Sequence, residues 1–199
     1  MLEKYAQLLC QYSIQAKKGQ TVLIKTSTEA IPLVKALYKE LLQIGCFVET
    51  DIDFEDKDRM FYDYAQDPQL KKPSVFYEKA IDEFDALVRV IAPHNLKSTA
   101  SVDSDLKKTH QEAMAPLKKK YMERSAKKEL KWVLCVYPTQ SAAQEAGMSL
   151  TEYQDFIFKG CMLDTDNPLA SWNKLSVSQQ GIVDRLNKAD RIRYVGEKT

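Results

Sequence analysis

Histidine and glycine are scarce in this sequence, and their scarcity excludes several kinds of site. Two histidines and six glycines stand among its 199 residues. The sequences GxGxxG, GxxxxGKS and GxxxxGKT are absent, so the loops that usually hold dinucleotides or nucleoside triphosphates are missing. HExxH is absent too, and no serine or cysteine stands at a recognisable distance from a base. The residues alone therefore reveal no active site.

The two histidines stand on different elements, and neither has an acidic residue at a spacing typical of metal ligands. His94 follows an apolar run, where it could face a cleft. His110 falls on the apolar stripe of a helical segment, where a packed histidine is more common than a ligand. Acidic residues are numerous, but no pair is singled out by its spacing. We therefore assign no catalytic, cofactor-binding or metal-binding residue to this sequence.

An excess of charge of one sign is also lacking. The net charge is +1, which gives no general attraction for nucleic acids or acidic membranes. Residues 107–131 hold nine lysines and arginines against three glutamates, but no series of aromatic side chains interleaves with them as a nucleic-acid platform would require. A solvated helix face explains these charges better. We expect no nucleic-acid partner.

Long apolar runs are missing as well. None approaches the roughly 20 residues that a transmembrane helix needs. The N-terminus carries Glu3 and no long apolar core, so it does not read as a signal peptide. The four cysteines, Cys10, Cys46, Cys135 and Cys161, stand far apart and form no CxxC or Cys/His cluster. We expect reduced, buried thiols in a cytoplasmic protein without a membrane partner.

Short apolar runs alternate with helical segments along the chain. This rhythm predicts an α/β fold, a doubly wound parallel sheet with helices on both faces. The expected strands are Thr21–Lys25, Cys46–Asp53, Ala86–Ala92 and Trp132–Tyr137. Ligands of such folds bind beyond the carboxyl ends of the strands. The polar residues expected there are Thr26, Ser27, Asp51, Asp53, His94, Asn95, Thr139 and Gln140.

Helical segments are predicted from apolar spacing and from capping residues. Ser149 with Glu152 three residues later forms a capping box, and Asn167 before Pro168 begins the last helix. An acidic and aromatic segment, 54–66, is expected to be a surface helix, and the prolines that follow it mark a linker. Residues 104–128 form a long helical stretch that Pro116 is expected to kink or divide into two helices.

The end of the chain has a different pattern. The last helix carries Trp172, Leu175, Gln179, Ile182 and Leu186 on one face. Residues 191–195 then alternate charged and apolar side chains, which predicts a half-exposed strand, either at a sheet edge or at the start of another sheet. We therefore divide the chain into an α/β domain over residues 1–190 and a strand, 191–199, that leads into a further domain.

Three stretches have a more distinctive sequence than the rest of the chain. They are VLIKTSTEAIPLVKALYKELLQIGCFVET, YPT followed by AAQEAGMSLTEYQDFIFKGC, and DNPLASWNKLSVSQQGIVDRLNKADRIRYVGEKT. Together they resemble the N-terminal domain of the thermophilic metallo-aminopeptidases, the aminopeptidase T and aminopeptidase S family, and the resemblance places essentially all of this chain inside that domain. The middle stretch is the most specific of the three.

This resemblance implies a function for the whole protein and a limited role for these residues. In that family two divalent metal ions (zinc, cobalt or magnesium) are held by a C-terminal domain, which a TDL sequence introduces. The present sequence reaches Thr199 where that pattern would begin, so no metal ligand can be carried over. The resemblance implies a non-catalytic N-terminal domain of a homodimeric enzyme that removes N-terminal residues from peptides. We expect Asn95 and Thr139, which stand at strand ends, to line the substrate cavity.

Two alternatives stay open. Metal-dependent ring-cleaving dioxygenases resemble the same family, and an N-terminal domain does not separate them from aminopeptidases. A freestanding α/β module that binds a small molecule or a protein is the other. The sequence beyond Thr199 would discriminate, because only the enzymes continue with TDL and a domain rich in glutamate and histidine.

Overall fold

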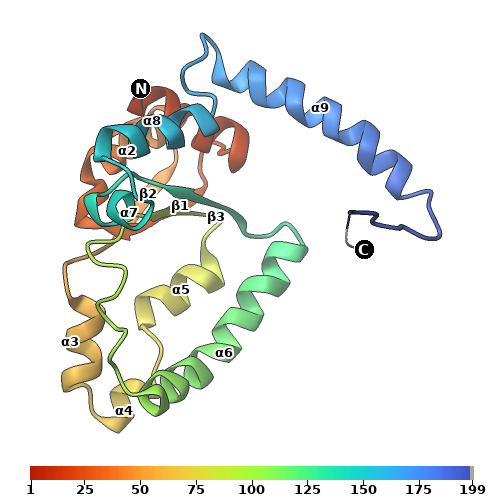
Figure 1. Ribbon diagram of the computed structural model, residues 1–199. Helices are drawn as coiled ribbons and strands as arrows, with labels where there is room; N and C mark the ends of the chain where they lie inside the picture. Colours follow the sequence, from red (N-terminus) through yellow and green to blue (C-terminus); the bar gives the residue numbers. More distant parts are fainter. Residues whose placement is uncertain (198–199) are drawn as a thin grey trace.

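A four-stranded parallel sheet forms the centre of the molecule, a computed structural model in which residues 1–197 are described (Figure 1). The strand order is β2-β1-β3-β4. The strands are β1 (Thr21–Ser27), β2 (Phe47–Asp53), β3 (Ala86–Ile91) and β4 (Lys131–Val136). All neighbouring strands pair in parallel, so the expected parallel α/β sheet is confirmed.

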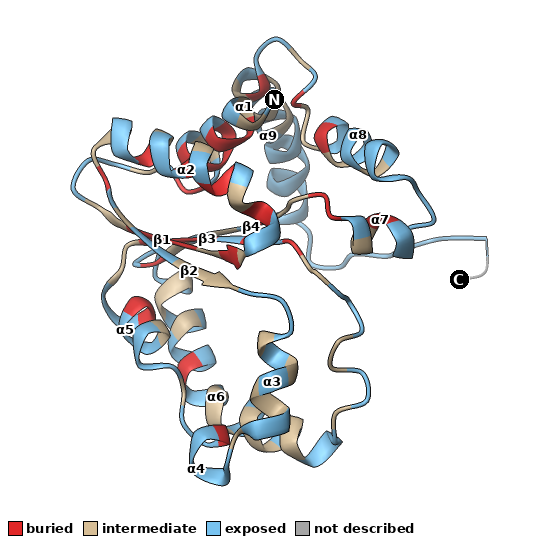
Figure 2. Ribbon diagram, turned by 90° about the vertical axis from the view of Figure 1, so that its left-hand side faces the viewer, coloured by how far each residue is buried: buried red, intermediate tan, exposed pale blue. Residues whose placement is uncertain are grey.

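Helices cover both faces of this sheet, as Figures 1 and 2 show. The helical elements are α1 (Leu2–Gln7), η1 (Leu8–Ser13), η2 (Thr28–Ala30), α2 (Ile31–Ile44), α3 (Lys57–Tyr64), α4 (Asp67–Leu70), α5 (Val75–Glu83), α6 (Ser104–Ala126), α7 (Gln140–Glu145), α8 (Leu150–Gly160) and α9 (Pro168–Leu186). The helices α1, α2 and α8 pack on one face, and α5 and α6 pack on the other. The doubly wound arrangement is therefore confirmed as well.

Strand β1 shows why both faces are covered. Its side chains alternate between the two layers: Val22 and Ile24 join the core under α2, whereas Leu23 packs with Leu87 and Ala80 on the opposite face. Each of these β1 residues is at most 1% exposed. Burying one such aliphatic side chain stabilises the fold by about 1.5–3 kcal/mol. A strand with apolar residues at successive positions is therefore stable only between two helical layers.

Helix boundaries follow local chemistry. Helix α2 ends at Gly45, whose φ of +92° is left-handed and whose N–H donates to the Leu41 carbonyl at 3.1 Å. The left-handed backbone favours glycine there, and a Cβ would also approach Cγ of the flexible Lys18 side chain to 3.0 Å. Helix α8 begins with the predicted capping box, in which the N–H of Ser149 donates to Glu152 Oε2 at 2.9 Å.

Two expectations about proline are revised. Pro116 does not divide α6 into two helices, because the helix continues through it. Both Pro116 and Glu112 are exposed, whereas Leu117 is buried against Ile81 and Leu130. The segment expected to be a linker contains the short helix α4, because Pro68 falls in its first turn, where proline is tolerated.

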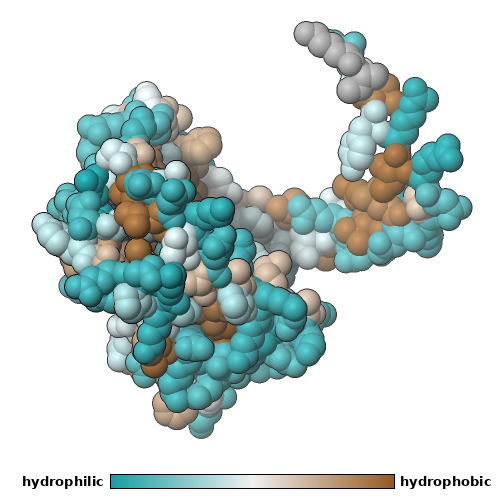
Figure 3. Space-filling model, turned by 90° about the horizontal axis from the view of Figure 1, so that it is seen from below, coloured by the Kyte–Doolittle hydropathy of each residue, from teal (hydrophilic) through white to brown (hydrophobic). Residues whose placement is uncertain are grey.

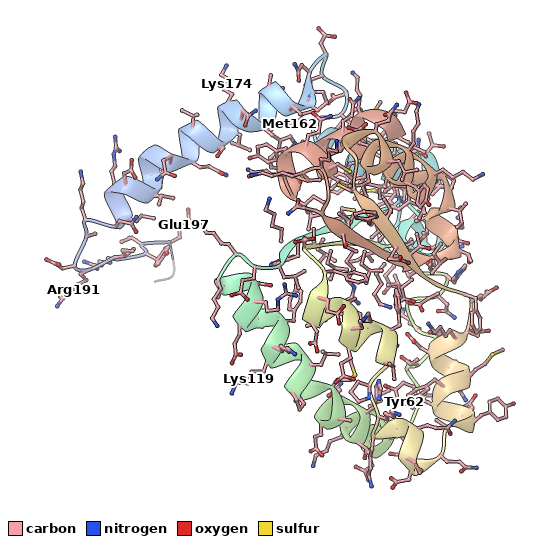
Figure 4. The ribbon with its side chains drawn as sticks, turned by 180° about the vertical axis from the view of Figure 1, so that it is seen from behind. Tyr62, Lys119, Met162, Lys174, Arg191 and Glu197 are labelled. Carbon is pink, nitrogen blue, oxygen red and sulfur yellow. The ribbon has the colours of Figure 1, made fainter. Side chains whose placement is uncertain are left out.

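The strand expected over residues 191–195 is not formed. Residues 187–197, which we call the tail, contain no helix or strand, and Ile192 and Tyr194 are 50% and 86% exposed. Helix α9 and the tail project from the body as an arm on which apolar side chains are exposed (Figure 3). In Figure 4, Arg191 lies at the far end of this arm.

Chain handedness explains why the tail does not extend the sheet beside β4. Helix α8 packs on the same face as α2, but the sheet order takes β1 to β2 in one direction, and a strand beyond β4 would lie in the other. A parallel strand added there would close a left-handed crossover, which α/β proteins almost never contain. The tail needs a partner strand from elsewhere, so its alternating sequence is not sufficient to form a strand.

The four cysteines are free, and Cys10, Cys46 and Cys135 are buried, as expected. Burial raises the pKa of the Cys10 thiol and raises that of Cys135 to about 12. Cys161 is half-buried, and burial raises its pKa too. These thiols remain protonated at neutral pH and are therefore weak nucleophiles.

Shortening one fully buried side chain should test the core. Leu37 of α2 is 0% exposed, so Leu37→Ala should lower the free energy of unfolding by about 2–5 kcal/mol in urea denaturation. The matched control is Leu42→Ala on the same helix, because Leu42 is 51% exposed and should lose about 0.5 kcal/mol or less. Equal losses in the two variants would contradict this assignment of the core.

Thiol titration should report the same burial. In denaturant without reductant, a chromogenic disulfide reagent should detect all four thiols, because all four are unpaired. In the native protein at pH 8, Cys161 should react before Cys10 and Cys135, whose thiolate populations are suppressed by burial. Recovery of fewer than four thiols in denaturant would reveal a disulfide and show the prediction to be wrong.

Candidate functional site

The carboxyl end of the sheet has a switch point between β1 and β3. The chain leaves β1 toward β2 on one side, and it leaves β3 toward β4 on the other. The connections therefore diverge where the two central strands end. Ligands of open α/β sheets usually bind at such a point. This geometry makes the residues that follow β1 and β3 the first candidates for a site.

Thr28, Glu29 and His94 meet at this switch point. Nδ1 of His94 lies 3.1 Å from Glu29 Oε1, and Nε2 of His94 lies 2.9 Å from Thr28 Oγ1. Thr28 and Glu29 directly follow β1, and His94 follows β3. The imidazole therefore links a carboxylate to a hydroxyl across the gap between two strands. We call these three residues the switch-point cluster.

Hydrogen bonds between strand ends hold the switch-point cluster in position. Thr26 Oγ1 donates to the Val90 carbonyl at 2.9 Å, and Ser27 Oγ donates to the Ala92 carbonyl. Ser27 Oγ also accepts the N–H of Glu29 at 3.3 Å. The bonds of Thr26 and Ser27 join the end of β1 to the end of β3. The bond between Glu29 and Ser27 closes the turn that follows β1. The cluster is therefore built on rigid elements.

The end of β4 lies beside the same place. Ser141 Oγ donates to the Pro93 carbonyl at 2.6 Å, which ties the start of α7 to the residue before His94. Tyr137 follows β4, and its pKa is raised by burial and by the negative charge of Glu29. A phenol, a carboxylate and an imidazole from the ends of three strands thus share one region.

The remaining predicted positions have other roles. Lys25 pairs with Asp51 and lies 3.7 Å from Asp53, so the two aspartates form ion pairs within the sheet edge. Asn95 is exposed, and its Oδ1 accepts the N–H of Lys97 at 2.8 Å. Gln140 is exposed at the start of α7. Lys25 thus engages both aspartates, and Asp53 pairs in register with Ser27 on the β2 side. On the other side Ser27 is bonded to the Ala92 carbonyl, two residues before His94.

Thr139 does not fit the role of a cavity wall. Its side chain is buried, at 2% exposure, and its Oγ1 accepts the N–H of Ala142 at 3.3 Å at the start of α7. The side chain is therefore occupied in capping a helix. Asn95 remains available for such a role because it is exposed.

Thr28, Glu29 and Tyr137 were not among the residues predicted from the sequence. Thr28 and Glu29 lie in the short helix η2. Tyr137 is the last residue of an expected strand. The available signal was position, because all three residues stand within two residues of a strand end. Their convergence depends on which strands are neighbours, and strand order cannot be read from spacing.

His110 is a packed histidine, as predicted. Its Nδ1 lies 3.0 Å from the Leu70 carbonyl, and its ring lies 4.9 Å from that of Phe61 and 6.2 Å from that of Tyr62. These contacts attach α3 and α4 to α6. The aromatic residues of α3 therefore pack against a neighbouring helix, and Tyr62 is seen at this end of the molecule in Figure 4.

A metal ion has no suitable donor set within the described residues. Across residues 1–197, no group of three or more histidine, cysteine, aspartate or glutamate side chains is placed to hold a metal ion. The switch-point cluster offers one imidazole and one carboxylate. Metal sites of hydrolases need several converging ligands and an open position. The residues described do not fit a two-metal centre.

An apolar cavity of about 330 Å³ lies at the open edge of β4. It is walled by η1, α8 and the first turns of α9, and its lining includes Tyr5, Tyr12, Phe156, Cys161 and Trp172. Trp172 packs 5.8 Å from Tyr12 and donates to the Cys161 carbonyl at 2.9 Å. This packing anchors the base of α9. The cavity lies away from the switch-point cluster and shares no lining residue with it.

Comparisons with known proteins agree on one family. The model of the thermophilic metalloprotease (M29) family matches residues 1–199. Aminopeptidase 2 of Geobacillus stearothermophilus is 25% identical over 215 aligned positions, covering 98% of this chain and 50% of that protein. Wild-type AmpT from Thermus thermophilus has the same fold, with a TM-score of 0.66 and 21% identity over 79% of this chain and 41% of that chain. The chain thus spans about half the length of the curated relative that it matches.

Among the helices in the described part of the chain, none has both the length and the apolar character needed to cross a membrane.

Proposed function

The chain belongs to the thermophilic metalloprotease (M29) family, and from this membership we propose that it acts as the non-catalytic N-terminal domain of a metal-dependent aminopeptidase. The complete enzyme would remove N-terminal residues from peptides. The observation that carries the proposal is the family match over residues 1–199, combined with the 50% of Aminopeptidase 2 that the chain covers.

The side chains of the described residues support the proposal that the metal ions lie in another domain. The family is one of metalloproteases, yet residues 1–197 lack a suitable donor set for a metal ion. Divalent ions in such enzymes activate a water molecule and polarise the peptide carbonyl. We place those ions, zinc, cobalt or magnesium, in a second domain. No step of peptide hydrolysis is assigned to the residues of this chain.

The part of this chain in the proposed enzyme is to wall the peptide cavity. The carboxyl end of the sheet supports this role, because the exposed Asn95 and the half-buried His94 lie there on rigid strand ends. Their amide and imidazole groups could accept or donate hydrogen bonds to a peptide backbone. The arm formed by α9 and the tail would connect this domain to the catalytic one.

Other features of the whole protein are part of the proposal. We propose a cytoplasmic homodimer without a nucleic-acid or membrane partner. The near-neutral charge and the free cysteines support this setting. Neither of the relatives described above is named a dioxygenase, so the comparisons do not support the ring-cleaving alternative or the freestanding module.

The proposal predicts an inactive domain and an active complete protein. The purified 199-residue chain should not cleave an aminoacyl-anilide in the presence of zinc, cobalt or magnesium, because the needed ligands do not converge in it. The gene's full-length product should cleave the same substrate under the same conditions. Release of the aniline chromophore measures both.

A metal titration provides the control. Calorimetry of the 199-residue chain with zinc should show no tight binding, whereas the full-length product should bind it tightly. Turnover of the anilide by the chain alone would overturn the proposed placement of the active site. A full-length product that is inactive on peptides but active on an aromatic diol would favour the dioxygenase alternative.

A further inference from the structure

We propose that the switch-point cluster is an esterolytic site in its own right. In this proposal the Thr28 hydroxyl attacks small activated carboxylic esters, His94 accepts and returns the proton, and Glu29 orients the imidazole. The activity would need no metal ion and is separate from the aminopeptidase function proposed above. The geometry of three side chains carries the inference.

The hydrogen bonds give the cluster a direction. A carboxylate only accepts hydrogen bonds, so the contact of 3.1 Å between Glu29 Oε1 and His94 Nδ1 places a proton on Nδ1. In a neutral imidazole this leaves Nε2 as an acceptor. Thr28 Oγ1 lies 2.9 Å from Nε2 and donates to it. Acid, imidazole and hydroxyl are therefore connected in the order found in serine hydrolase triads.

Exposure of the three side chains suits these roles. The His94 side chain is 16% exposed, so its orientation is constrained by its surroundings. Glu29 is 40% exposed at its side chain, and Thr28 is exposed, so a small ester can reach the hydroxyl. A nucleophile that is accessible and a base that is held in place are the features that an activated hydroxyl requires.

The backbone places Thr28 where α/β enzymes place nucleophiles. Thr28 begins η2 between the end of β1 and the start of α2. This strand–turn–helix junction displays the side chain at the carboxyl end of the sheet, where ligands of α/β folds bind. Ser27 holds the junction through its bonds to Glu29 and Ala92. The hydroxyl of Thr28 is therefore displayed from a rigid turn.

Neighbouring groups could support the developing charge. Asn95 follows His94, and its Oδ1 is already bonded to the N–H of Lys97, so its Nδ2 is the donor that remains for a substrate oxygen. The Lys97 ammonium pairs with Glu145 at 3.0 Å, so this cation is engaged elsewhere than at Glu29. Burial, with the Glu29 charge, raises the pKa of Tyr137 and keeps its phenol protonated beside the cluster.

The reaction balances with water as the co-reactant. A bond forms between Thr28 Oγ1 and the acyl carbon while the hydroxyl proton passes to His94 Nε2. The tetrahedral intermediate then loses its alcohol, as the bond to the departing oxygen breaks and that oxygen takes the Nε2 proton. Water attacks the acyl-threonine, gives its proton to Nε2, and releases the carboxylic acid. The proton returns to Thr28 Oγ1, so no electrons or protons are left over.

The test is hydrolysis of p-nitrophenyl acetate by the 199-residue chain in the presence of EDTA. A positioned general acid or base accelerates a reaction by about 10²–10⁴-fold. Thr28→Val and His94→Gln should therefore each lower the rate of ester hydrolysis at least about tenfold, toward the rate without protein. Thr28→Ser should retain activity because it keeps the hydroxyl. Glu29→Gln should give an intermediate loss because it removes the charge that orients the ring.

The chain offers a matched control for the histidine. His110→Gln removes the other of the two histidines, which packs against aromatic rings away from the cluster, and should leave the rate unchanged. Thermal unfolding of every variant checks that a loss of rate is not a loss of folding. Because EDTA is present and the readout is an ester, this result is independent of whether the full-length product is an aminopeptidase.

Mass spectrometry of the acyl-enzyme decides the chemistry. After rapid acid quenching, an acetyl group should be found on the peptide that contains Thr28, and it should be absent from Thr28→Val. A wild-type rate no higher than that of Thr28→Val would overturn the proposal. So would loss of rate in His94→Gln without loss in Thr28→Val, because that pattern would make the imidazole itself the nucleophile.

Discussion

The burial of β1 between two helical layers is the constraint on which the rest of this structure depends. Strand β1 pairs in parallel with both β2 and β3, and its apolar side chains enter the cores on both faces. Because parallel crossovers are right-handed, helices cover both faces only when the connections run in both directions along the sheet, as they do from β1 and from β3. The switch point, and with it the polar cluster, therefore accompanies the burial of the central strand on both faces.

The same constraint separates the stable part of the chain from its arm. Helices α1, α2 and α8 pack on the sheet, and Trp172 completes the cavity beside β4. Beyond it, Ile182 and Leu186 are 58% and 44% exposed, and the described residues of the tail form no strand. Apolar residues exposed in this way are typical of a surface that another part of a protein covers. The arm therefore suits the proposed link to a second domain.

Two kinds of chemistry are attributed to different parts of the protein. Peptide hydrolysis in the M29 family depends on metal, and the described residues have no donor set for it. The switch-point cluster uses hydroxyl, imidazole and carboxylate groups that need no metal. In the two proposals, the groups of the switch-point cluster are distinct from the metal ions that hydrolyse peptides. The two experiments separate these contributions because each has a different substrate and a different metal requirement.

The amino-acid sequence by itself determined the fold class, because apolar runs such as those of β1 and β3 and capping residues such as Ser149 act over a few neighbouring positions. It also determined that His110 packs and that the thiols are unpaired. Only the tertiary structure decided that Glu29, Thr28 and His94 meet, since 66 residues separate the last two. It also decided that the tail forms no strand, because a parallel strand beside β4 would need a left-handed crossover. Capping and strand formation depend on interactions between residues that are close in the sequence, whereas strand order and pairing depend on the packing of the whole chain.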